Sequence, residues 1–302
     1  MSNRLISLVG ASMLVFSLIS LSTLPSEAQD KPAANKQHFL WKIKTAKNTV
    51  YLLGSIHLLK KEHYPLPDVM EKAYLDSQTV VLELQLDQAT QQSIQQLALA
   101  KGIYASDKSL QSTISQNTYD LTKKRAAELG LNIATLAQLK PWLIALTLTS
   151  LKFQRMGLEP QYGVDMHFMG KAKQDSKEIV SFETAEYQIN RFAELADNSQ
   201  ESLLLSTLKD LDNVDSSFNK IVDSWLNGNE KGLEDLLLGS LKTNPEVYDR
   251  LIIERNRNWL PQIEGYLQQS KNYLVIVGAA HLVGDNGVIN LLKKKGFSIE
   301  QL

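Results

Sequence analysis

Two apolar runs that end in Gly-x-x-His constrain this chain more than any other feature. One is YLLGSIH, which ends at His57, and the other is VIVGAAH, which ends at His281 near the opposite end of the chain. Runs of Val, Ile and Leu bounded by Gly are typical of strands buried on both faces of a sheet. Open α/β sheets bind their ligands beyond the carboxyl ends of such strands. We therefore expect the two histidines to meet in one site.

The other apolar runs cluster at the two ends of the chain, with one between them. Together these runs predict strands at 39–44, 48–54, 79–85, 178–182, 273–277 and 297–301. Helical patterns fill the intervals, and Pro261 is expected to kink or split a helix over 246–269. The pattern predicts an α/β fold whose central sheet is built from both ends of the chain. Helices flank that sheet, and the mostly helical middle forms a cap within one domain, 39–302.

The first 28 residues have the pattern of a signal peptide. Arg4 precedes an uncharged stretch at 5–24, and Ser26 and Ala28 supply small residues for cleavage before Gln29. The alternative is an uncleaved membrane anchor, but several serines dilute the apolar run. We expect cleavage, a flexible lead-in at 29–38, and a periplasmic or secreted protein.

Composition limits the class of partner. The chain has 32 basic and 33 acidic residues, with no long run of one sign, which argues against a nucleic-acid partner. It has no cysteine, so its stability must come from burial rather than disulfides. We expect a peptide or small-molecule substrate, and a membrane tether only where the N-terminal segment stays uncleaved.

Glu83 is the carboxylate that best complements the two histidines. It lies in the apolar run TVVLELQ, where an unpaired carboxylate would cost several kcal/mol or raise its own pKa. The alternative places Glu83 on the solvent face of an edge strand. Imidazole is a common metal ligand, and a site with two histidines needs at least one carboxylate.

Four further polar residues follow strands or begin helices. Glu183 is either a helix cap or a residue of the same crevice, and Asp165 suits a helix start through the helix dipole alone. Arg255 and Asn256 lie in ERNRNW, which is either a solvated helix face or a group aimed into the crevice. An arginine there would stabilise an oxyanion or hold a substrate carboxylate.

Seven short motifs occur in an order that resembles the TraB/GumN family, which includes PrgY and is related to Tiki proteases and to the erythromycin esterase-like superfamily. The motifs are YLLGSIHLL, PLP, VVLEL, YGVDMHFMGKA, SFETAEYQ, ERNRNW and VIVGAAHLVGDNGV. The resemblance covers about 39–302. It implies an α/β fold with a central sheet and a hydrolase-like site.

The resemblance also implies which residues form that site. The paired Gly-x-x-His motifs of the family match Gly54 with His57 and Gly278 with His281, and the family's strand glutamate matches Glu83. The family's arginine-asparagine pair, its Gly-x-Asp segment and its Glu-Thr segment match at Arg255, Asn256, Asp165 and Glu183. Tiki-type members are described as divalent-metal-dependent proteases.

We therefore expect an exported, metal-dependent hydrolase that acts on peptides. His57 and His281 would bind a divalent metal ion, with Glu83 as third ligand or as general base. Arg255 would stabilise the oxyanion and Asn256 would orient the substrate. The remaining matched residues, Glu183 as a catalytic group and Asp165, Gly54 and Gly278 as substrate contacts, complete the expected site.

Two alternatives remain open. In the first, a metal-independent esterase-like hydrolase uses His57 as a general base that Glu83 activates. In the second, the chain is not an enzyme and binds a peptide, or binds haem through one histidine.

Overall fold

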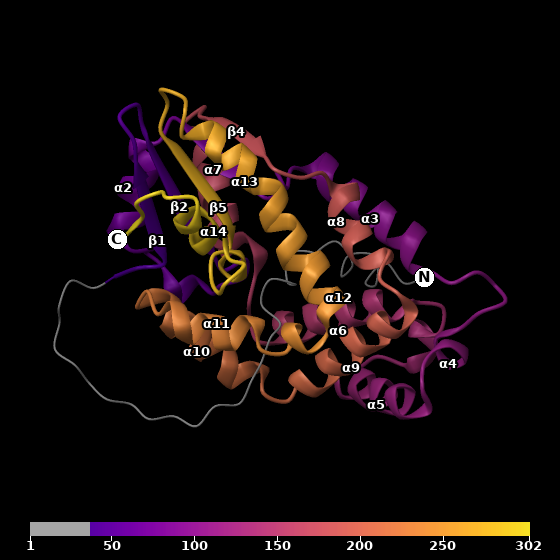
Figure 1. Ribbon diagram of the computed structural model, residues 1–302. Helices are drawn as coiled ribbons and strands as arrows, with labels where there is room; N and C mark the ends of the chain where they lie inside the picture. Colours follow the sequence, from indigo (N-terminus) through magenta and orange to yellow (C-terminus); the bar gives the residue numbers. More distant parts are fainter. Residues whose placement is uncertain (1–36) are drawn as a thin grey trace.

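The computed structural model describes residues 37–302, and Figure 1 shows their arrangement. The predicted signal peptide and most of the predicted lead-in lie outside the described residues. Within the described part, one mixed sheet lies at the left of the view and helices extend to the right of it and below. This is the predicted α/β fold with a largely helical middle segment.

Six strands form the sheet within the described residues, in the order β4-β3-β5-β2-β1-β6. They are β1 (Leu40–Lys44), β2 (Thr49–Ser55), β3 (Thr79–Leu82), β4 (Glu178–Ser181), β5 (Tyr273–Gly278) and β6 (Glu300–Gln301). The strands β2, β5, β3 and β4 run parallel, whereas β1 is antiparallel to both β2 and β6. The sheet is therefore built from both ends of the chain, as predicted.

The two strands that carry the Gly-x-x-His motifs are immediate neighbours. Their register runs from Val50 opposite Tyr273 to Ser55 opposite Gly278. Because the strands are parallel, both motifs leave the sheet at the same edge. All six residues of β5 are buried, which explains the unbroken apolar run in this part of the sequence.

The helices form two groups, one near the sheet and one in a separate helical part beside it (Figure 1). Near the sheet lie α2 (Asp68–Asp76), α7 (Val164–Gln174), α13 (Glu254–Tyr266) and α14 (Val288–Lys294), and α7 contacts both β3 and β4. The helical part contains α3 (Gln88–Gly102), α4 (Leu110–Thr113), α5 (Gln116–Glu128), α6 (Pro141–Arg155), α8 (Ala185–Ala193), α9 (Asp197–Asp210), α10 (Val214–Leu226), α11 (Glu230–Leu238) and α12 (Pro245–Tyr248).

The helix α6 forms the core of the helical part. Every residue from Pro141 to Ser150 is buried, because α6 is apolar on nearly all sides and packs against α9 and α3. Its first residue is proline, whose missing N–H is not needed at a helix start. Across residues 37–302, no helix has both the length and the apolar character that crossing a membrane requires.

The structure corrects four details of the predicted elements. The strand predicted at 79–85 ends at Leu82, so Glu83 lies just beyond its carboxyl end, and the strand predicted at 297–301 shortens to β6. A π-helical turn, Asp249–Ile253, joins α12 to α13. Pro261 lies within α13 without splitting it, because the proline faces solvent while neighbouring Trp259 and Ile263 are buried.

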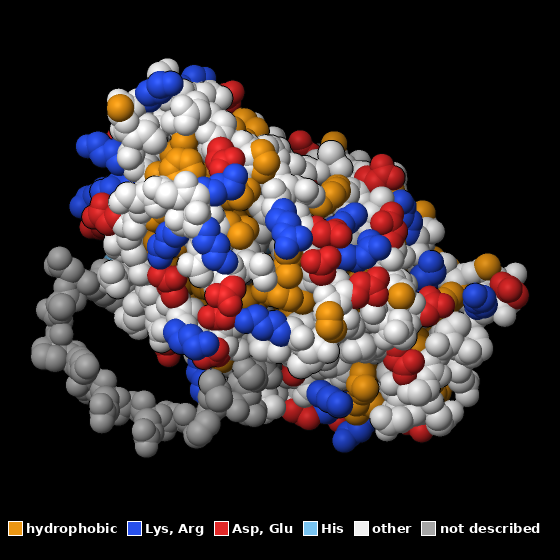
Figure 2. Space-filling view, viewed as in Figure 1, with side chains coloured by type: hydrophobic (Ala, Val, Ile, Leu, Met, Phe, Trp, Pro, Cys, Tyr) orange, Lys and Arg blue, Asp and Glu red, His pale blue; other side chains and the backbone are white. Residues whose placement is uncertain are grey.

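The surface carries charges of both signs in close mixture. Figure 2 shows Lys and Arg side chains interspersed with Asp and Glu over the face in view. This mixture agrees with the nearly balanced charge of the sequence, 32 basic against 33 acidic residues.

Candidate functional site

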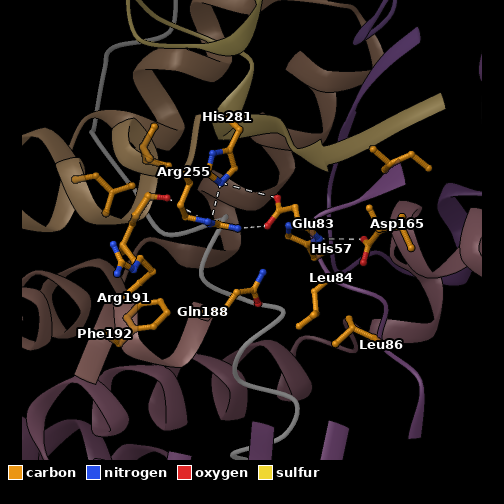
Figure 3. A pocket seen from close by; sticks show the side chains of 15 residues that line it. His57, Glu83, Leu84, Leu86, Asp165, Gln188, Arg191, Phe192, Arg255 and His281 are labelled. Atoms are coloured by element: carbon orange, nitrogen blue, oxygen red, sulfur yellow. Dashed lines mark hydrogen bonds and ion pairs between the residues drawn. The ribbon is translucent and has the colours of Figure 1, made fainter. Parts of the chain in front are cut away.

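A cleft opens at the carboxyl edge of the parallel strands, and the empty space in and directly in front of it is about 800 Å³. Its charged wall contains His57, Glu83, Asp165, Arg255 and His281, which the sequence spreads over more than two hundred positions (Figure 3). The rest of the lining is mainly apolar, but it also contains Gln188 and Arg191; the apolar residues are Leu82, Leu84, Leu86, Phe192, Leu241, Leu251, Ile252 and Ile276. The cleft thus joins a charged end to an apolar surface.

His57 is buried and held by Asp165. The distance from its Nδ1 to Asp165 Oδ1 is 3.0 Å, and the Ser55 hydroxyl donates to the same oxygen at 2.7 Å. Because an ionised carboxylate only accepts hydrogen bonds, the proton of neutral His57 is on Nδ1 and the lone pair is on Nε2. This arrangement fixes the tautomer that a general base needs.

The start of α7 brings Asp165 to His57. The Val164 N–H donates to the Ile56 carbonyl at 3.1 Å, so the helix begins directly against the loop that carries His57. Gly163 caps this helix, and a Cβ at Gly163 would lie 2.2 Å from the His57 carbonyl oxygen. Only glycine permits so close an approach of the two backbones.

The environment raises the pKa of His57 above its usual value. Burial lowers this pKa, but the negative charge of Asp165 and its hydrogen bond outweigh burial, with a further contribution from Glu83. His57 is therefore a stronger base than an ordinary histidine, and it takes up a proton more readily near neutral pH.

Arg255 is the centre of the charged wall. Its Nε and Nη2 donate to the two oxygens of Glu183 at 2.8 and 2.9 Å, and Nη2 also pairs with Glu83. Its Nη1 donates to the Leu251 carbonyl at 3.3 Å and to His281 Nε2 at 3.0 Å. All five N–H groups of the guanidinium are thus engaged by protein acceptors. Burial lowers the pKa of Arg255, but the two carboxylates outweigh it and raise this pKa.

Glu83 is held as a carboxylate from two sides. Its Oε1 accepts the Gly278 N–H at 2.6 Å, and its Oε2 pairs with Arg255. Burial alone would raise the pKa of Glu83, but the positive charge of Arg255 lowers it below its usual range. Glu83 therefore carries its negative charge across the neutral pH range.

His281 is fully engaged by its neighbours. Its Nδ1 lies 2.7 Å from Asn256 Oδ1, and its ring packs against Trp259 with 4.5 Å between ring centroids. Burial and the nearby charge of Arg255 lower the pKa of His281 to about 3, so it is neutral near pH 7. Nδ1–H then donates to Asn256, and Nε2 accepts from Arg255.

Glu183 lies behind Arg255 rather than on the wall of the cleft. Besides the arginine, it accepts the Trp259 indole N–H at 2.9 Å and the Gln188 side-chain amide at 2.9 Å. Neither Trp259 nor Gln188 is singled out by the sequence. The available signal is the position of Gln188, five residues after Glu183 in the first turns of α8.

The other residues predicted for the site support it from outside the cleft. Asn256 anchors the His281 loop through its Nδ2, which donates to the carbonyls of His281 and Asn286 at 3.2 and 2.8 Å. Gly54 does not line the cleft: a Cβ there would lie 2.2 Å from Phe39 Cδ1. Gly278 contributes its N–H to Glu83 and no lining surface.

The donor set does not fit a divalent metal ion as it is arranged. Within residues 37–302, no three His, Asp or Glu side chains are placed so that they could share one ion. Both nitrogens of His281 and both oxygens of Glu83 already have partners, and the fixed positive charge of Arg255 lies between them. A metal bound by these two residues would have to displace the guanidinium.

The sequence is similar to one protein family and to several known proteins. A family model described as the TraB/PrgY/gumN family matches residues 39–301. The uncharacterized protein YbaP of Escherichia coli strain K12, and YbaP of Shigella flexneri, are each 25% identical over 243 residues, covering 80% of this chain and 87% of the relative. A metalloprotease TIKI homolog of Amphimedon queenslandica is 36% identical over 61 residues, which are 20% of this chain and 12% of that protein. No solved structure gives a significant match.

Proposed function

The chain belongs to the TraB/PrgY/gumN family, and from that membership and the contact between His57 and Asp165 we propose that it is a hydrolase of carbonyl compounds, with peptides as its substrates. The contact between these two residues carries the proposal. It supplies an oriented base with a raised pKa at the polar end of a largely apolar cleft.

The proposed reaction uses protein groups and water. His57 Nε2 accepts a proton from a water molecule, and the resulting hydroxide attacks the substrate carbonyl carbon. The protonated His57 then returns the proton to the leaving nitrogen, so that a carboxylic acid and an amine are released. Asp165 keeps the imidazole in the required tautomer and stabilises its charged form.

Arg255 and Glu83 set the electrostatic field around this step. All five N–H groups of Arg255 have protein partners, so the arginine must release one of them before it can donate to an oxyanion. The role of Arg255 as an oxyanion donor stays a prediction, and its engaged hydrogen bonds favour a positioning role. His281 shares that role, since both its ring nitrogens are in use.

Replacement of His57 tests the proposal. The variant His57→Gln is expected to lower kcat/KM on a peptide library by about 10²–10⁴-fold, because general-base catalysis contributes this much. His167→Gln is the matched control, since His167 also pairs with a carboxylate, Glu71 at 2.9 Å, but lies outside the cleft. Equal activity of the wild type and His57→Gln would contradict the proposal.

A metal-dependent peptidase is the second candidate, and the name of the TIKI relative favours it. The measurement is the metal content of the purified protein together with peptide hydrolysis before and after EDTA. Activity that EDTA abolishes and one divalent ion restores would favour the metal-dependent reaction. Activity that EDTA leaves unchanged would favour the reaction through His57 alone.

Export remains part of the proposal because residues 1–28 have the pattern of a signal peptide. N-terminal sequencing of the protein isolated from its native cell envelope or medium tests this point. A mature chain that begins at Gln29 is the expected result, and a chain that retains residues 1–28 would contradict cleavage.

A further inference from the structure

Gln188 is a polar side chain of the cleft that the proposed reaction leaves unused. It projects from α8 into the lining of the cleft, and Figure 3 shows it below Arg255, with Phe192 to its left and Leu84 to its right in this view. Its amide can both donate and accept hydrogen bonds. Which of the two groups, the NH₂ or the carbonyl oxygen, is available to a substrate depends on the contacts of the other.

Glu183 decides the orientation of this amide. The distance between Gln188 Nε2 and Glu183 Oε2 is 2.9 Å. Glu183 is buried beside Arg255 as an acceptor-only carboxylate, so it must meet the NH₂ half of the amide rather than the carbonyl half. The amide of Gln188 is therefore fixed, and its carbonyl oxygen, Oε1, is the group left for a ligand. Across residues 37–302, no side-chain or backbone donor contacts this oxygen.

The charge of the surroundings agrees with an acceptor at this position. Glu83 and Glu183 pair with Arg255, Asp165 pairs with His57, and Arg191 of the cleft lining pairs with Glu254, so each arginine at the cleft already has a carboxylate partner. Such a site disfavours a substrate carboxylate and favours a group that presents a hydrogen-bond donor. The neighbouring apolar wall favours an uncharged, apolar group beside that donor.

We propose that Gln188 is a specificity-determining residue whose Oε1 accepts an N–H from the substrate, so that the cleft selects uncharged apolar amides over the corresponding esters. This inference rests on the proposed hydrolase function and narrows its substrate class. An ester has an oxygen where the amide has its N–H. Two acceptors would then face each other, and the amide would bind more tightly.

The test compares two probes that differ in one group. They are N-acetyl-leucyl-leucinamide and the analogue in which an ester oxygen replaces the N–H between the two leucines. Dissociation constants are measured by calorimetry in the His57→Gln background, so that neither probe is consumed. The amide is expected to bind about 3–10-fold more tightly than the ester, the ratio that one neutral hydrogen bond provides.

Two substitutions at Gln188 test its acceptor and the contact that orients it. Gln188→Met keeps a similar length without an acceptor and is expected to bind both probes equally. Gln188→Glu removes the N–H that Glu183 accepts and places a second carboxylate beside it, so this variant is also expected to lose the preference for the amide. Gln200→Met is the matched control, because Gln200 Nε2 likewise donates to the residue five positions earlier, Leu195, at 2.9 Å, but outside the cleft.

The outcomes separate this inference from the proposed function. A preference that survives in Gln188→Met, or a His57→Gln parent with intact Gln188 that binds neither probe, would overturn the role of Gln188. Turnover of peptides by the wild type in the same experiment series would leave the hydrolase proposal standing. A preference that depends on Gln188 without any turnover would support Gln188 as a binding residue and count against hydrolysis.

Discussion

Arg255 lies between Glu83 and Glu183 in a part of the molecule from which water is largely excluded. The arginine is 8% exposed and Glu183 is 9% exposed. A buried pair of opposite charges gains little over a well-packed apolar pair, yet removing one partner leaves the other charge uncompensated. The network is therefore sensitive to loss of the arginine.

The variant Arg255→Met is expected to lower the free energy of unfolding by about 3–5 kcal/mol, because it leaves two buried carboxylates without their cation. Urea denaturation at pH 7 measures this change. Arg250→Met is the control, since Arg250 pairs with Glu194 and Glu246 at the surface and should cost less than about 1 kcal/mol. An equal loss of unfolding free energy in the two variants would show that the buried ion pairs contribute no more to stability than the surface ones.

The contact between His57 and Asp165 predicts a pH dependence. The deprotonated histidine is the active base, so activity should rise as pH increases through the raised pKa of His57. Asp165→Asn removes the charge that raises this pKa, so the acidic limb of kcat/KM should move to lower pH while kcat falls. Glu71→Gln, which removes the partner of His167, should leave the limb in place. An unshifted limb in Asp165→Asn would contradict the assignment of His57 as the base.

The same contact predicts the sign of a stability change. Because folding raises the pKa of His57, the protonated histidine adds stability that is fully present below its unfolded pKa of about 6.5. That contribution is lost as pH rises through the folded pKa. The difference in unfolding free energy between wild type and Asp165→Asn should therefore be larger at pH 5.5 than at pH 9. A difference that grows with pH would reverse the expected sign.

At the residue scale, the sequence predicted the members of the charged wall better than their contacts. His57, His281, Glu83, Asp165 and Arg255 all line the cleft. The partner of His57 was not predictable, because Asp165 has a sufficient local role at a helix start and lies 108 positions away. Contacts of this kind depend on packing between elements, which local patterns do not encode.

At the scale of elements, the strand β2 packs more tightly than its composition suggests. A Cβ at Gly54 would lie 2.2 and 2.6 Å from two atoms of the Phe39 ring and 3.3 Å from Ala279 Cα. The Gly54 carbonyl also accepts the Trp225 indole N–H at 2.6 Å, which ties β2 to α10. The glycine of the first motif thus serves packing around the strand that carries His57.

Gly54→Ala is expected to lower the free energy of unfolding by about 1–3 kcal/mol through overpacking, as measured in urea. Gly265→Ala in α13 is the control, since a Cβ there meets no atom within 4 Å and alanine favours helix. Combining Gly54→Ala with Phe39→Leu should recover part of the loss, because the two side chains compete for one space. Strictly additive effects would contradict direct contact between them.

The junction between α12 and α13 shows where element prediction fails. The sequence over 246–269 has a helical pattern, and Pro261 suggested the break. The irregularity lies instead at the π-helical turn, Asp249–Ile253, which presents the Leu251 carbonyl to Arg255. Turns of this type occur often at functional sites and have no strong residue signature. Packing of the buried face of α13 holds the helix across its proline.

At the scale of the whole molecule, the predicted class and the meeting of the two chain ends are confirmed. Hydrophobic periodicity was sufficient for this, because strands buried on both faces leave a strong apolar signal. The arrangement of the helical part was not predictable to the same degree. The two walls of the cleft come from segments whose mutual placement is decided by packing alone.

Removing residues 300–302 tests how far the last strand supports the sheet. Leu302 exchanges backbone hydrogen bonds with His38 and Leu40, and the Gln301 side chain donates to the carbonyls of His38 and Gly228. Loss of these four bonds is expected to lower the free energy of unfolding by about 2–5 kcal/mol. It should also expose the edge of β1 to self-association, which light scattering detects. An unchanged urea midpoint would show that β1 needs no outer neighbour.

The hydrogen bond from Gly278 to Glu83 joins two residues that the ribosome makes at different times during synthesis of the chain. Its two partners are 195 positions apart, so a ribosome working from the amino end produces the donor about 10–40 s after the acceptor. Arg255 follows Glu83 by 172 positions, so both partners of the glutamate are made only in the last part of synthesis. The charged wall of the cleft can therefore be completed only after the C-terminal part of the chain has been synthesised.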